Sequence, residues 1–586
     1  MYMLQTSPSL GESITPMLVE GGLTAIGVAI AFAWPRLGFA GFSRIERQFG
    51  RLARRQGLAV AVVGLTMLLL RLVILPLLPR PLPVIADDFS FLLSGDTFAH
   101  GRLANPTPAM WVHLEAIFVD MKPTYMSMYF PGQGLVLATG KVLFGHPWYG
   151  LLIASALMCS ALCWMLQAWL PPCWALLGGF LSVLRLGIFS YWTNSYTGGG
   201  SIAALGGALV LGGLPRFMRT ARLRYALLMA VGIALLIITR PYECVLLCIP
   251  VAVAMIHWLL TAKNRPTAAV LFRRTVPALA LLVAVAAWLG YYDYRAFGNP
   301  LTLPYTVNRA TYAMAPYYFW QSPRPEPVYH HEVMLHYYRD VELAEFNSFR
   351  KPSGFLLQTL IKPVRAELFF AGFALFPPLV FLPWTLRDRR IRFLVVCLLV
   401  LTAGMLIEIY LLPHYLAPFA GALYAVGLQA MRHLWHWSPG GQRVGTTIVR
   451  LSVTICLVMA GLRLFDRALH FPISEAPPSA WMDRWYGPDH FGTERANIES
   501  RLEQLPGQQL VLVRASADPY LTQEWIFNAA DIDDSKVIWA HEMDGASNRE
   551  LFQYYKNRKV WLVQPDLSPA EAVPYPVPEQ VTPVTR

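Results

Sequence analysis

Long blocks of apolar residues recur along most of the chain and limit what it can fold into. About twelve of them reach the roughly 17 to 25 residues that an α-helix needs to cross a bilayer. Only 14% of the 586 residues are charged, whereas soluble proteins carry about a quarter. We therefore predict a polytopic α-helical membrane protein over residues 1–464. The predicted spans lie near 12–34, 57–78, 147–170, 174–190, 199–214, 224–240, 243–260, 275–292, 366–385, 392–411, 415–432 and 446–464.

The distribution of Lys and Arg predicts how these spans are oriented. Short loops that are rich in these residues stay in the cytoplasm, and five such loops fall on one face of the predicted bundle. The turn at Pro171–Pro172 lies on the same face but has no basic residue. We thus expect a multi-pass protein of the inner (cytoplasmic) membrane, and we attribute the net charge of +12 to topology and not to nucleic-acid binding. The basic loops are 41–57, 215–224, 261–274, 385–392 and 431–443.

The opposite, extracytoplasmic face carries two long loops, 79–146 and 293–365, and the chain after residue 465. From 465 to 586 the composition becomes that of a soluble domain. Three strand-like runs alternate with two helical patterns, which predicts a small α/β domain with an extended or disordered Pro-rich tail. The strand-like runs are 509–515, 536–542 and 559–565, and the helical patterns lie near 492–505 and 547–556.

Asp87 and Asp88 are adjacent carboxylates near the start of the first long outer loop, where a short helix is predicted. Adjacent carboxylates raise one another's pKa, which suits a general base that works near neutral pH. The alternative is that one of them caps the helix while the other is solvated. Five aromatic residues in this loop or directly after it are expected at the depth of the membrane interface, which Tyr and Trp favour: Trp111, Tyr125, Tyr129, Trp148 and Tyr149.

Ionisable residues within the predicted spans gather in the halves nearest the outer face. Such residues normally face a bundle interior or a water-filled cavity, so we predict a polar cavity that opens to the outer side. Local pairing, for example between Arg240 and Glu243, is the alternative. The residues concerned are Arg71, Arg185, Arg240, Glu243, Asp293, Glu367, Glu408 and His414. The pairs Cys159/Cys163 and Cys244/Cys248 are predicted to pack between helices and not to bind a metal.

Several short motifs in the membrane part resemble those of the GT-C superfamily of membrane glycosyltransferases. An acidic pair after an early span, at Asp87-Asp88, is followed by Pro131-Gly132 and by Leu143-Phe144-Gly145. The segments TRPYE (239–243) and PHYLAP (413–418) are similar to a bacterial group classed with protein O-mannosyltransferases and lipid A aminoarabinose transferases. The chain departs from that group in having Asp-Asp-Phe in place of Asp-Glu-Phe. It also has an additional predicted span at 12–34.

The resemblance implies a GT-C-like fold and a transfer of sugar from a polyprenyl-phosphate donor to a glycan, lipid or protein acceptor on the outer face. It implies that Asp87 is the general base and that Asp88 orients it. A divalent ion at Asp88 is left open, and no cofactor is required by the sequence. Cationic side chains would bind the donor phosphate, and further polar residues would line the substrate cavity. These are Arg185, Arg240, His414, Arg309 and Arg71 for the phosphate, and Glu243, Tyr415 and Glu408 for the cavity.

Two other functions are compatible with the sequence. About twelve spans are also usual for a transporter or flippase of lipid-linked sugars, although no inverted repeat or matched pair of broken helices is evident. A noncatalytic membrane scaffold is the second alternative, but it would leave the charged outer cavity unexplained.

Overall fold

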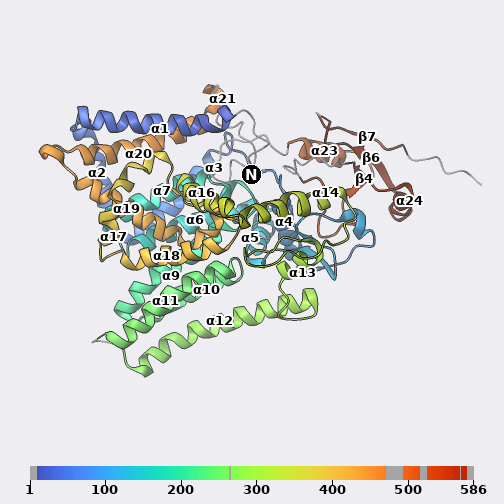
Figure 1. Ribbon diagram of the computed structural model, residues 1–586, viewed down its shortest axis with the longest axis horizontal. Helices are drawn as coiled ribbons and strands as arrows, with labels where there is room; N and C mark the ends of the chain where they lie inside the picture. The colour runs from blue at the N-terminus through green and yellow to red at the C-terminus, as the bar shows by residue number, and fades with distance from the viewer. Residues whose placement is uncertain (1–9, 263–265, 470–492, 515–523, 568, 577–586) are drawn as a thin grey trace, which may run out of the picture.

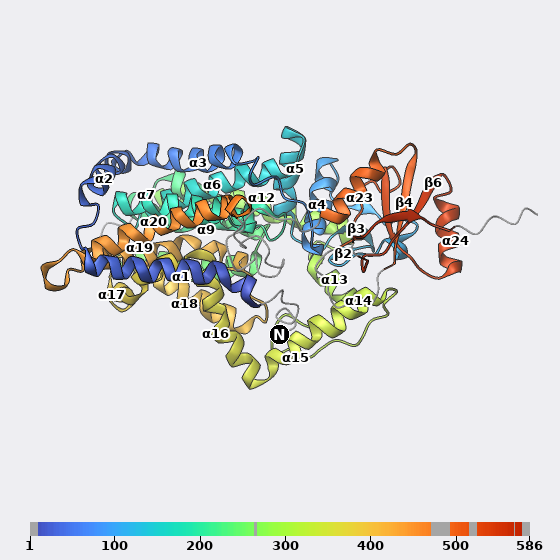
Figure 2. The ribbon, with the colours of Figure 1, turned by 90° about the horizontal axis from the view of Figure 1, so that it is seen from above.

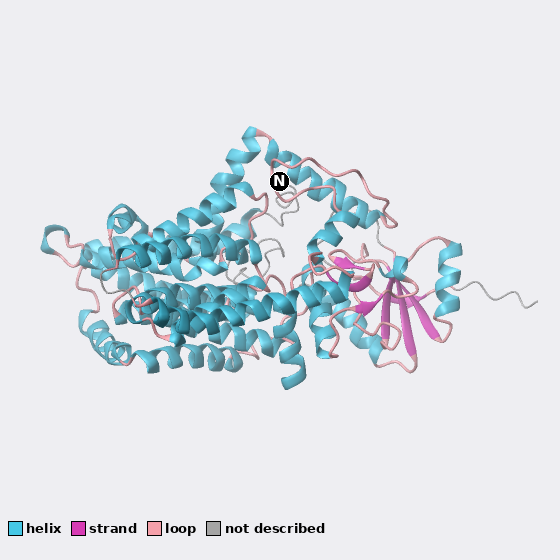
Figure 3. Ribbon diagram, turned by 90° about the horizontal axis from the view of Figure 1, so that it is seen from below, coloured by secondary structure: helices cyan, strands magenta, loops and turns pink. Residues whose placement is uncertain are grey.

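The computed structural model describes residues 10–262, 266–469, 493–514, 524–567 and 569–576. A long bundle of helices occupies one end of the molecule, and the sheet formed by the C-terminal part occupies the other (Figures 1 and 2). The strands gather at that second end (Figure 3). Residues 470–492 of the predicted α/β domain, residue 515 of its first strand run and 577–586 of the tail lie outside the described residues.

Seven helices of the bundle are long and apolar enough to cross a membrane. They are α1 (Leu10–Ala33), α3 (Gln56–Val73), α6 (Trp148–Leu166), α9 (Gly200–Thr220), α11 (Pro241–Thr261), α12 (Ala268–Phe297) and α20 (Val444–Leu464). Along the apolar window of α12 only 6% of the residues are buried inside the protein. Large apolar side chains such as Leu279 and Val283 are therefore exposed there, as expected for a surface that faces lipid.

The other helices of the bundle are shorter. Three of them are apolar: α7 (Pro172–Ser182), which continues as a π-helix to Ile188, α10 (Leu223–Ile237) and α18 (Arg392–Ile407). The remaining ones are α2 (Phe39–Arg54), α17 (Leu382–Arg387) and α19 (Ala420–His436). All of the predicted spans except 366–385 coincide with one helix, but length and composition alone identify seven or at most eight of them.

The predicted straight span at 366–385 is wrong. In its place α16 (Pro352–Phe370) ends near Gly372, and the chain turns by 93° into the segment Phe373–Arg387. Gly372 has a φ of +69°, which favours glycine. Pro377 follows Gly372 and has no backbone N–H to donate to a preceding helical turn, so it cannot continue the helix. This stretch is apolar, as the prediction assumed, but its Gly and Pro residues break the helix.

The first long loop is structured throughout. It contains α4 (Ala86–Ala99), the 3₁₀-helix η2 (Trp111–Leu114), α5 (Pro131–Phe144) and the short strands β1 (Asn105–Pro106), β2 (Val119–Asp120) and β3 (Thr124–Ser127). The helix predicted at the acidic pair is α4. Tyr129 and Trp148 are both buried, with 7% and 0% of their surface exposed, so neither side chain lies on the protein surface.

The second long loop forms an arm beside the first. It consists of α13 (Pro304–Tyr312), α14 (Glu332–Leu335), a π-helix (His336–Leu343) and α15 (Ala344–Arg350), and it leads into α16. Figure 2 shows α14, α15 and α16 projecting together from the body of the molecule. The arm is attached to the first loop by buried polar contacts: Asn308 donates to the Asp120 carboxylate at 3.0 Å, and Tyr312 donates to Glu115 at 2.9 Å.

The strands predicted in the C-terminal part are confirmed. The sheet has the order β5-β4-β6-β7, in which β5 (Val537–His541), β4 (Gln508–Val513) and β6 (Arg558–Val563) are parallel. The short β7 (Ala572–Pro574) pairs antiparallel with β6, so this part of the Pro-rich tail is extended. The helices α23 (Thr493–Glu503) and α24 (Gly545–Tyr554) match the two predicted helical patterns.

The C-terminal sheet and the first long loop share one hydrophobic core. Leu93 of α4 and Tyr125 of β3 belong to the same buried cluster as Leu510 and Trp539 of the sheet. The Tyr125 hydroxyl also donates to the backbone oxygen of Asn528 at 2.8 Å. The sheet therefore supports α4, the helix that carries the acidic pair.

Close packing of α9 against the 3₁₀-helix η8 (Ala417–Phe419) positions the PHYLAP segment. A Cβ atom on Gly207 would lie 1.8 Å from the carbonyl oxygen of Pro418. We predict that Gly207→Ala destabilises the protein by about 1–3 kcal/mol, the usual cost of overpacking. Gly427→Ala in α19 is the matched control, because its Cβ atom would have no neighbour within 4 Å. Thermal unfolding in detergent would measure both, and equal stability of the two variants would contradict the packing.

Candidate active site

Asp88 ties the start of α4 to the segment that precedes α9. Its carboxylate accepts hydrogen bonds from the backbone N–H of Val84 at 3.2 Å, the hydroxyl of Ser195 at 2.5 Å and the backbone N–H of Tyr196 at 2.9 Å. The side chain is 2% exposed. Through Val84 it ties the start of α4 to the residues before it, and no side-chain hydrogen bond caps the helix at Ile85. Asp88 is thus a positioning residue.

Asp87 points in another direction. Its carboxylate accepts a hydrogen bond of 2.5 Å from the hydroxyl of Tyr129, and the side chain remains partly exposed. The Tyr129 ring is stacked on Phe91 at a centroid distance of 4.2 Å and meets Tyr305 edge-on at 5.5 Å. Aromatic packing therefore fixes the donor to Asp87, while the carboxylate itself stays accessible.

Burial raises the pKa of Asp87 to about 6. The neighbouring Asp88 raises this pKa further, as expected for adjacent carboxylates, while the hydrogen bond from Tyr129 and the charge of Arg240 lower it. Burial also raises the pKa of Asp88, against its three hydrogen bonds. At neutral pH Asp87 is mostly ionised but close enough to its pKa to exchange a proton, which is the property required of a general base.

Arg240 lies at the N-terminus of α11, where Pro241 occupies the first helical position. Its Nη2 donates to the backbone oxygen of Gly198 at 2.8 Å, and its Nη1 is 3.9 Å from Glu243 Oε1. The guanidinium also stacks over the ring of Tyr415 at 4.7 Å. Of the five N–H groups of an Arg side chain, the hydrogen bond to Gly198 uses one.

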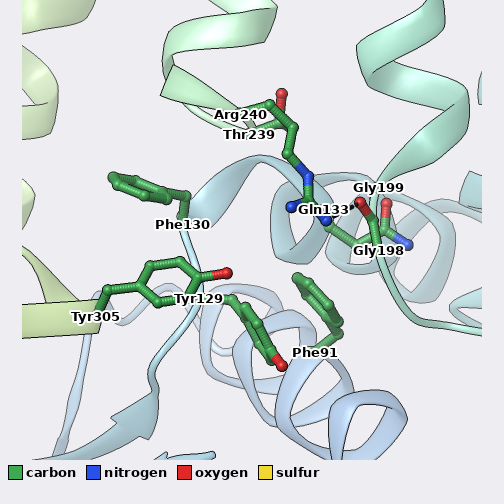
Figure 4. Close-up of a pocket in the computed structure, with 9 residues that line it drawn as sticks. All are labelled: Phe91, Tyr129, Phe130, Gln133, Gly198, Gly199, Thr239, Arg240 and Tyr305. Carbon is green, nitrogen blue, oxygen red and sulfur yellow. Dashed lines mark hydrogen bonds between the residues drawn. The ribbon is translucent and has the colours of Figure 1, made fainter. Parts of the chain in front are cut away.

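A small pocket lies between α4, α5 and the start of α11. Figure 4 shows Arg240 entering it from one side, with Tyr129 and Tyr305 on the other. Arg240 is the cationic residue among the described residues that line it. The lining is formed by Phe91, Tyr129, Phe130, Gln133, Gly198, Gly199, Thr239, Arg240 and Tyr305.

The glycines before α9 allow this close arrangement. Gly198 and Gly199 have φ angles of +84° and +65°, which other residues adopt rarely. A Cβ atom on Gly198 would also lie 2.6 Å from Nδ1 of His414. His414 in turn shares a hydrogen bond of 2.5 Å with the hydroxyl of Tyr191.

The structure brings most of the predicted site residues together. Glu408 interacts through charge with both Glu243 and Arg240, so it belongs to the same polar cluster. Both alternatives considered for these residues are partly met, since Arg240 is paired locally with Glu243 and also faces a pocket. Among the predicted site residues, Arg240 lines the pocket itself. The others adjoin it through described contacts: Asp87 with Tyr129, Asp88 with Tyr196, Glu243 and Tyr415 with Arg240, Glu408 with Glu243, and His414 beside Gly198.

Three predicted phosphate-binding residues have described partners elsewhere. Arg71 donates to the backbone oxygens of Leu78 and Pro79 and to the side chain of Asn194. It thereby fixes the start of the first long loop. Arg71 supports the acidic pair indirectly, because its partner Asn194 directly precedes Ser195 and Tyr196, which donate hydrogen bonds to Asp88.

Arg185 and Arg309 are likewise occupied by other groups. Arg185 Nη1 lies 3.5 Å from Glu20 of α1, and its Nη2 donates to the backbone oxygen of Leu368. Arg309 forms a buried, bidentate ion pair with Glu342 within the second long loop. Of the five residues predicted to bind phosphate, Arg240 is the one among the described residues that line the pocket, and His414 lies beside Gly198.

The described residues do not favour a metal site at Asp88. Nowhere in the described ranges do three or more His, Cys, Asp or Glu side chains converge in a way that could hold a metal ion. The carboxylate oxygens of Asp88 already accept three hydrogen bonds from the protein. Cys244 and Cys248, with their sulfur atoms 3.9 Å apart, pack side by side.

Sequence reasoning missed several residues of the site. Tyr129 was expected at the membrane interface, and Tyr305 lies in a loop without an obvious motif. Ser195 and Tyr196 belong to none of the motifs named from the sequence. The signal that could have found them is their position, since Tyr129 directly precedes the Phe130-Pro131 start of α5, and Ser195 and Tyr196 lie three and two residues before Gly198.

The comparisons with known proteins gave structural neighbours only. No family model matches the chain, and no curated protein matches it. The oligosaccharyltransferase of Archaeoglobus fulgidus, solved with Zn and sulfate, is similar at a TM-score of 0.46 and 11% identity, over 86% of this chain and 67% of that one. ArnT from Cupriavidus metallidurans in the apo state gives 0.47 and 14%, over 85% and 92%.

A second structure of the archaeal enzyme, AglB in complex with an inhibitory peptide and a dolichol-phosphate, gives a TM-score of 0.39 at 10% identity, over 87% of this chain and 69% of that one.

The environment of Asp87 predicts a titration that can be measured directly. The carboxyl band of Asp87, identified in difference infrared spectra by its loss in Asp87→Asn, should titrate near pH 6. Tyr129→Phe should move the midpoint upward, because it removes the hydrogen bond that lowers the pKa. Tyr305→Phe is the control, since it keeps the aromatic packing without altering that hydrogen bond. A midpoint near the ordinary value of about 4 for Asp, or the same midpoint in both variants, would contradict this environment.

Proposed function

We propose that this chain is a membrane glycosyltransferase that moves a sugar from a polyprenyl-phosphate donor to an acceptor on the outer face of the membrane. One observation carries the proposal. Arg240 lines the same pocket as Tyr129, the residue that donates to Asp87. A base and an anion-binding cation thus flank one space, at the end of the apolar bundle that holds the structured loops.

The chemistry that this arrangement supports is a single displacement. The acceptor hydroxyl attacks the anomeric carbon of the sugar, and a new C–O glycosidic bond forms. The bond between that carbon and the phosphate oxygen breaks, and its electron pair leaves with the lipid phosphate. The proton of the acceptor passes to Asp87, which is the general base. The displacement would invert the configuration at the anomeric carbon.

Arg240 would stabilise the departing phosphate. A guanidinium matches phosphate oxygens with two parallel N–H donors, and its stacking on Tyr415 and its contact with Gly198 fix its position beforehand. Electrostatic stabilisation of this kind is strongest where donors are already oriented and water is excluded. His414 lies behind Gly198 and would add a second polar group to the same cluster.

The arrangement of charge along the molecule supports the proposed outer location. The basic helix α2 and the segment α17 lie at one end of the bundle, and the C-terminal sheet lies at the other (Figure 1). By the positive-inside rule the first end would be cytoplasmic. The site and the sheet would then be extracytoplasmic, on the periplasmic side of the inner membrane, where lipid-linked donor and acceptor would meet.

The roles of the two carboxylates predict different outcomes for their amide variants. Asp87→Asn should abolish transfer from a polyprenyl-phosphate sugar, with a loss of about 10² to 10⁴ in rate, because the amide cannot accept the proton. Donor binding should be retained. Asp88→Asn, in contrast, should lower the stability of the protein, because the N–H group of the new amide would face the N–H donor of Val84.

Transfer assays on both variants and on the parent protein would test these roles. The parent rate should fall below pH 6, as Asp87 becomes protonated. Wild-type transfer by Asp87→Asn would overturn the assignment. Movement of the lipid-linked sugar across vesicle membranes without a new glycosidic bond would instead identify a transporter. The absence of both transfer and movement would favour a noncatalytic scaffold.

The role of Arg240 predicts a defect in donor binding. Arg240→Gln should weaken binding of the polyprenyl-phosphate donor by about ten- to hundredfold, the range expected from a charge-assisted hydrogen bond worth roughly 1.5–3 kcal/mol. Arg185→Gln is the comparison, because the described partners of Arg185 are Glu20 and Leu368. It should lower thermal stability and leave donor affinity unchanged. The opposite pattern in a binding titration would move the phosphate site to Arg185.

A further inference from the structure

A second, larger cavity lies at the basic end of the bundle, far along the chain from the acidic pair. It has about 740 Å³ of empty space and is open on one side. Three segments meet there: the turn between α6 and α7, the last turns of α9, and the loop between α17 and α18. The residues that the argument uses are Trp169, Leu170, Pro171, Pro215, Arg219 and Arg390.

This convergence explains the turn at Pro171–Pro172, which has no basic residue of its own. Arg219, from the next basic loop along the chain, places its Nη2 3.2 Å from the backbone oxygen of Ala168 and its Nε 3.1 Å from that of Pro215. Arg390 reaches the same cavity from a third loop. The turn is therefore basic in the folded protein although it is not basic in sequence.

The two cations are available to an anion. Arg219 and Arg390 are both exposed, and the side chain of Arg390 forms no hydrogen bond or ion pair within the part of the chain that the structure describes. The nearby carboxylate of Asp388 is already engaged, since it accepts from the backbone N–H of Arg390 at 2.9 Å and from Gln429 at 2.6 Å. No carboxylate is among the described residues that line the cavity.

The rest of the lining is suited to lipid. Trp169 is half-buried, is stacked on Phe393 at 5.8 Å and donates its indole N–H to the backbone oxygen of Leu211 at 3.0 Å. Trp favours the depth of the lipid headgroups, and Leu170, Pro171 and Pro215 present an apolar wall beside it. An occupant therefore meets two guanidinium groups together with apolar surface, near the ends of α6 and α9.

We propose that this cavity binds the phosphate headgroup of an anionic membrane phospholipid. Basic pockets between membrane helices on the cytoplasmic side are suited to such headgroups, and Arg matches phosphate geometry. The site is separate from the pocket at Asp87 and independent of the proposed transfer reaction. Its occupant would fix the ends of α6, α9 and α18 relative to one another.

The test compares two charge-matched double variants of the full chain in detergent micelles. Arg219→Gln/Arg390→Gln removes the two cations of the cavity. Arg44→Gln/Arg47→Gln removes two exposed cations of the basic helix α2, away from the cavity lining. Binding of phosphatidylglycerol and of phosphatidylcholine is followed by native mass spectrometry, with thermal unfolding as the check on folding. Arg390→Gln alone is included, because it disturbs no described side-chain hydrogen bond.

We expect the cavity double variant to weaken phosphatidylglycerol binding by about tenfold or more, and Arg390→Gln to weaken it by part of that amount. The α2 variant should change it by less than about twofold, since Arg44 and Arg47 are not among the residues that line the cavity and distant exposed charges are screened. Equal weakening in both double variants, or equal binding of phosphatidylcholine, would overturn the site. Binding of inorganic phosphate without binding of phosphatidylglycerol would assign the cavity to a soluble anion and overturn the lipid.

Discussion

The carboxylate of Asp88 holds together the parts of the protein on which the site depends. Its hydrogen bonds join the start of α4 to Ser195 and Tyr196, which are more than 100 residues away in the chain. The same segment continues into Gly198, whose backbone oxygen fixes Arg240. A single buried acidic residue thus sets the distance between the proposed base and the proposed phosphate-binding residue. The pair Asp87-Asp88 is asymmetric, because Asp88 is held by hydrogen bonds that stabilise the fold, whereas Asp87 is the proposed general base.

Much of this architecture could be predicted from local sequence. The strands of the C-terminal sheet and the helix at Asp87 were predictable because apolar runs and an acidic helix start depend on neighbouring residues. The break at Gly372 was missed, because composition over a window averages out one glycine and a proline. The contact of Tyr129 with Asp87 could not be predicted, since it joins residues 42 positions apart through tertiary packing.

The charged residues of the spans illustrate the same limit. Their concentration at one depth predicted a polar site, and Arg240, Glu243, Glu408 and His414 do gather there. Depth alone could not separate Arg240, which lines the pocket, from Arg185, which lies against Glu20. That difference depends on which face of each helix turns toward which neighbour, and hydropathy carries no such information.

The common core of the first loop and the C-terminal sheet has a consequence for the order of folding. Tyr125 bonds to Asn528, a partner 403 residues later in the chain. Contacts with such long sequence separation form slowly, because a large loop must close before they stabilise anything. During synthesis α4 therefore remains incompletely packed until the C-terminal strands have been synthesised. The contacts that support α4 form only after the C-terminal strands have been synthesised, so shortened chains that keep every predicted span would lack the support of the proposed base Asp87.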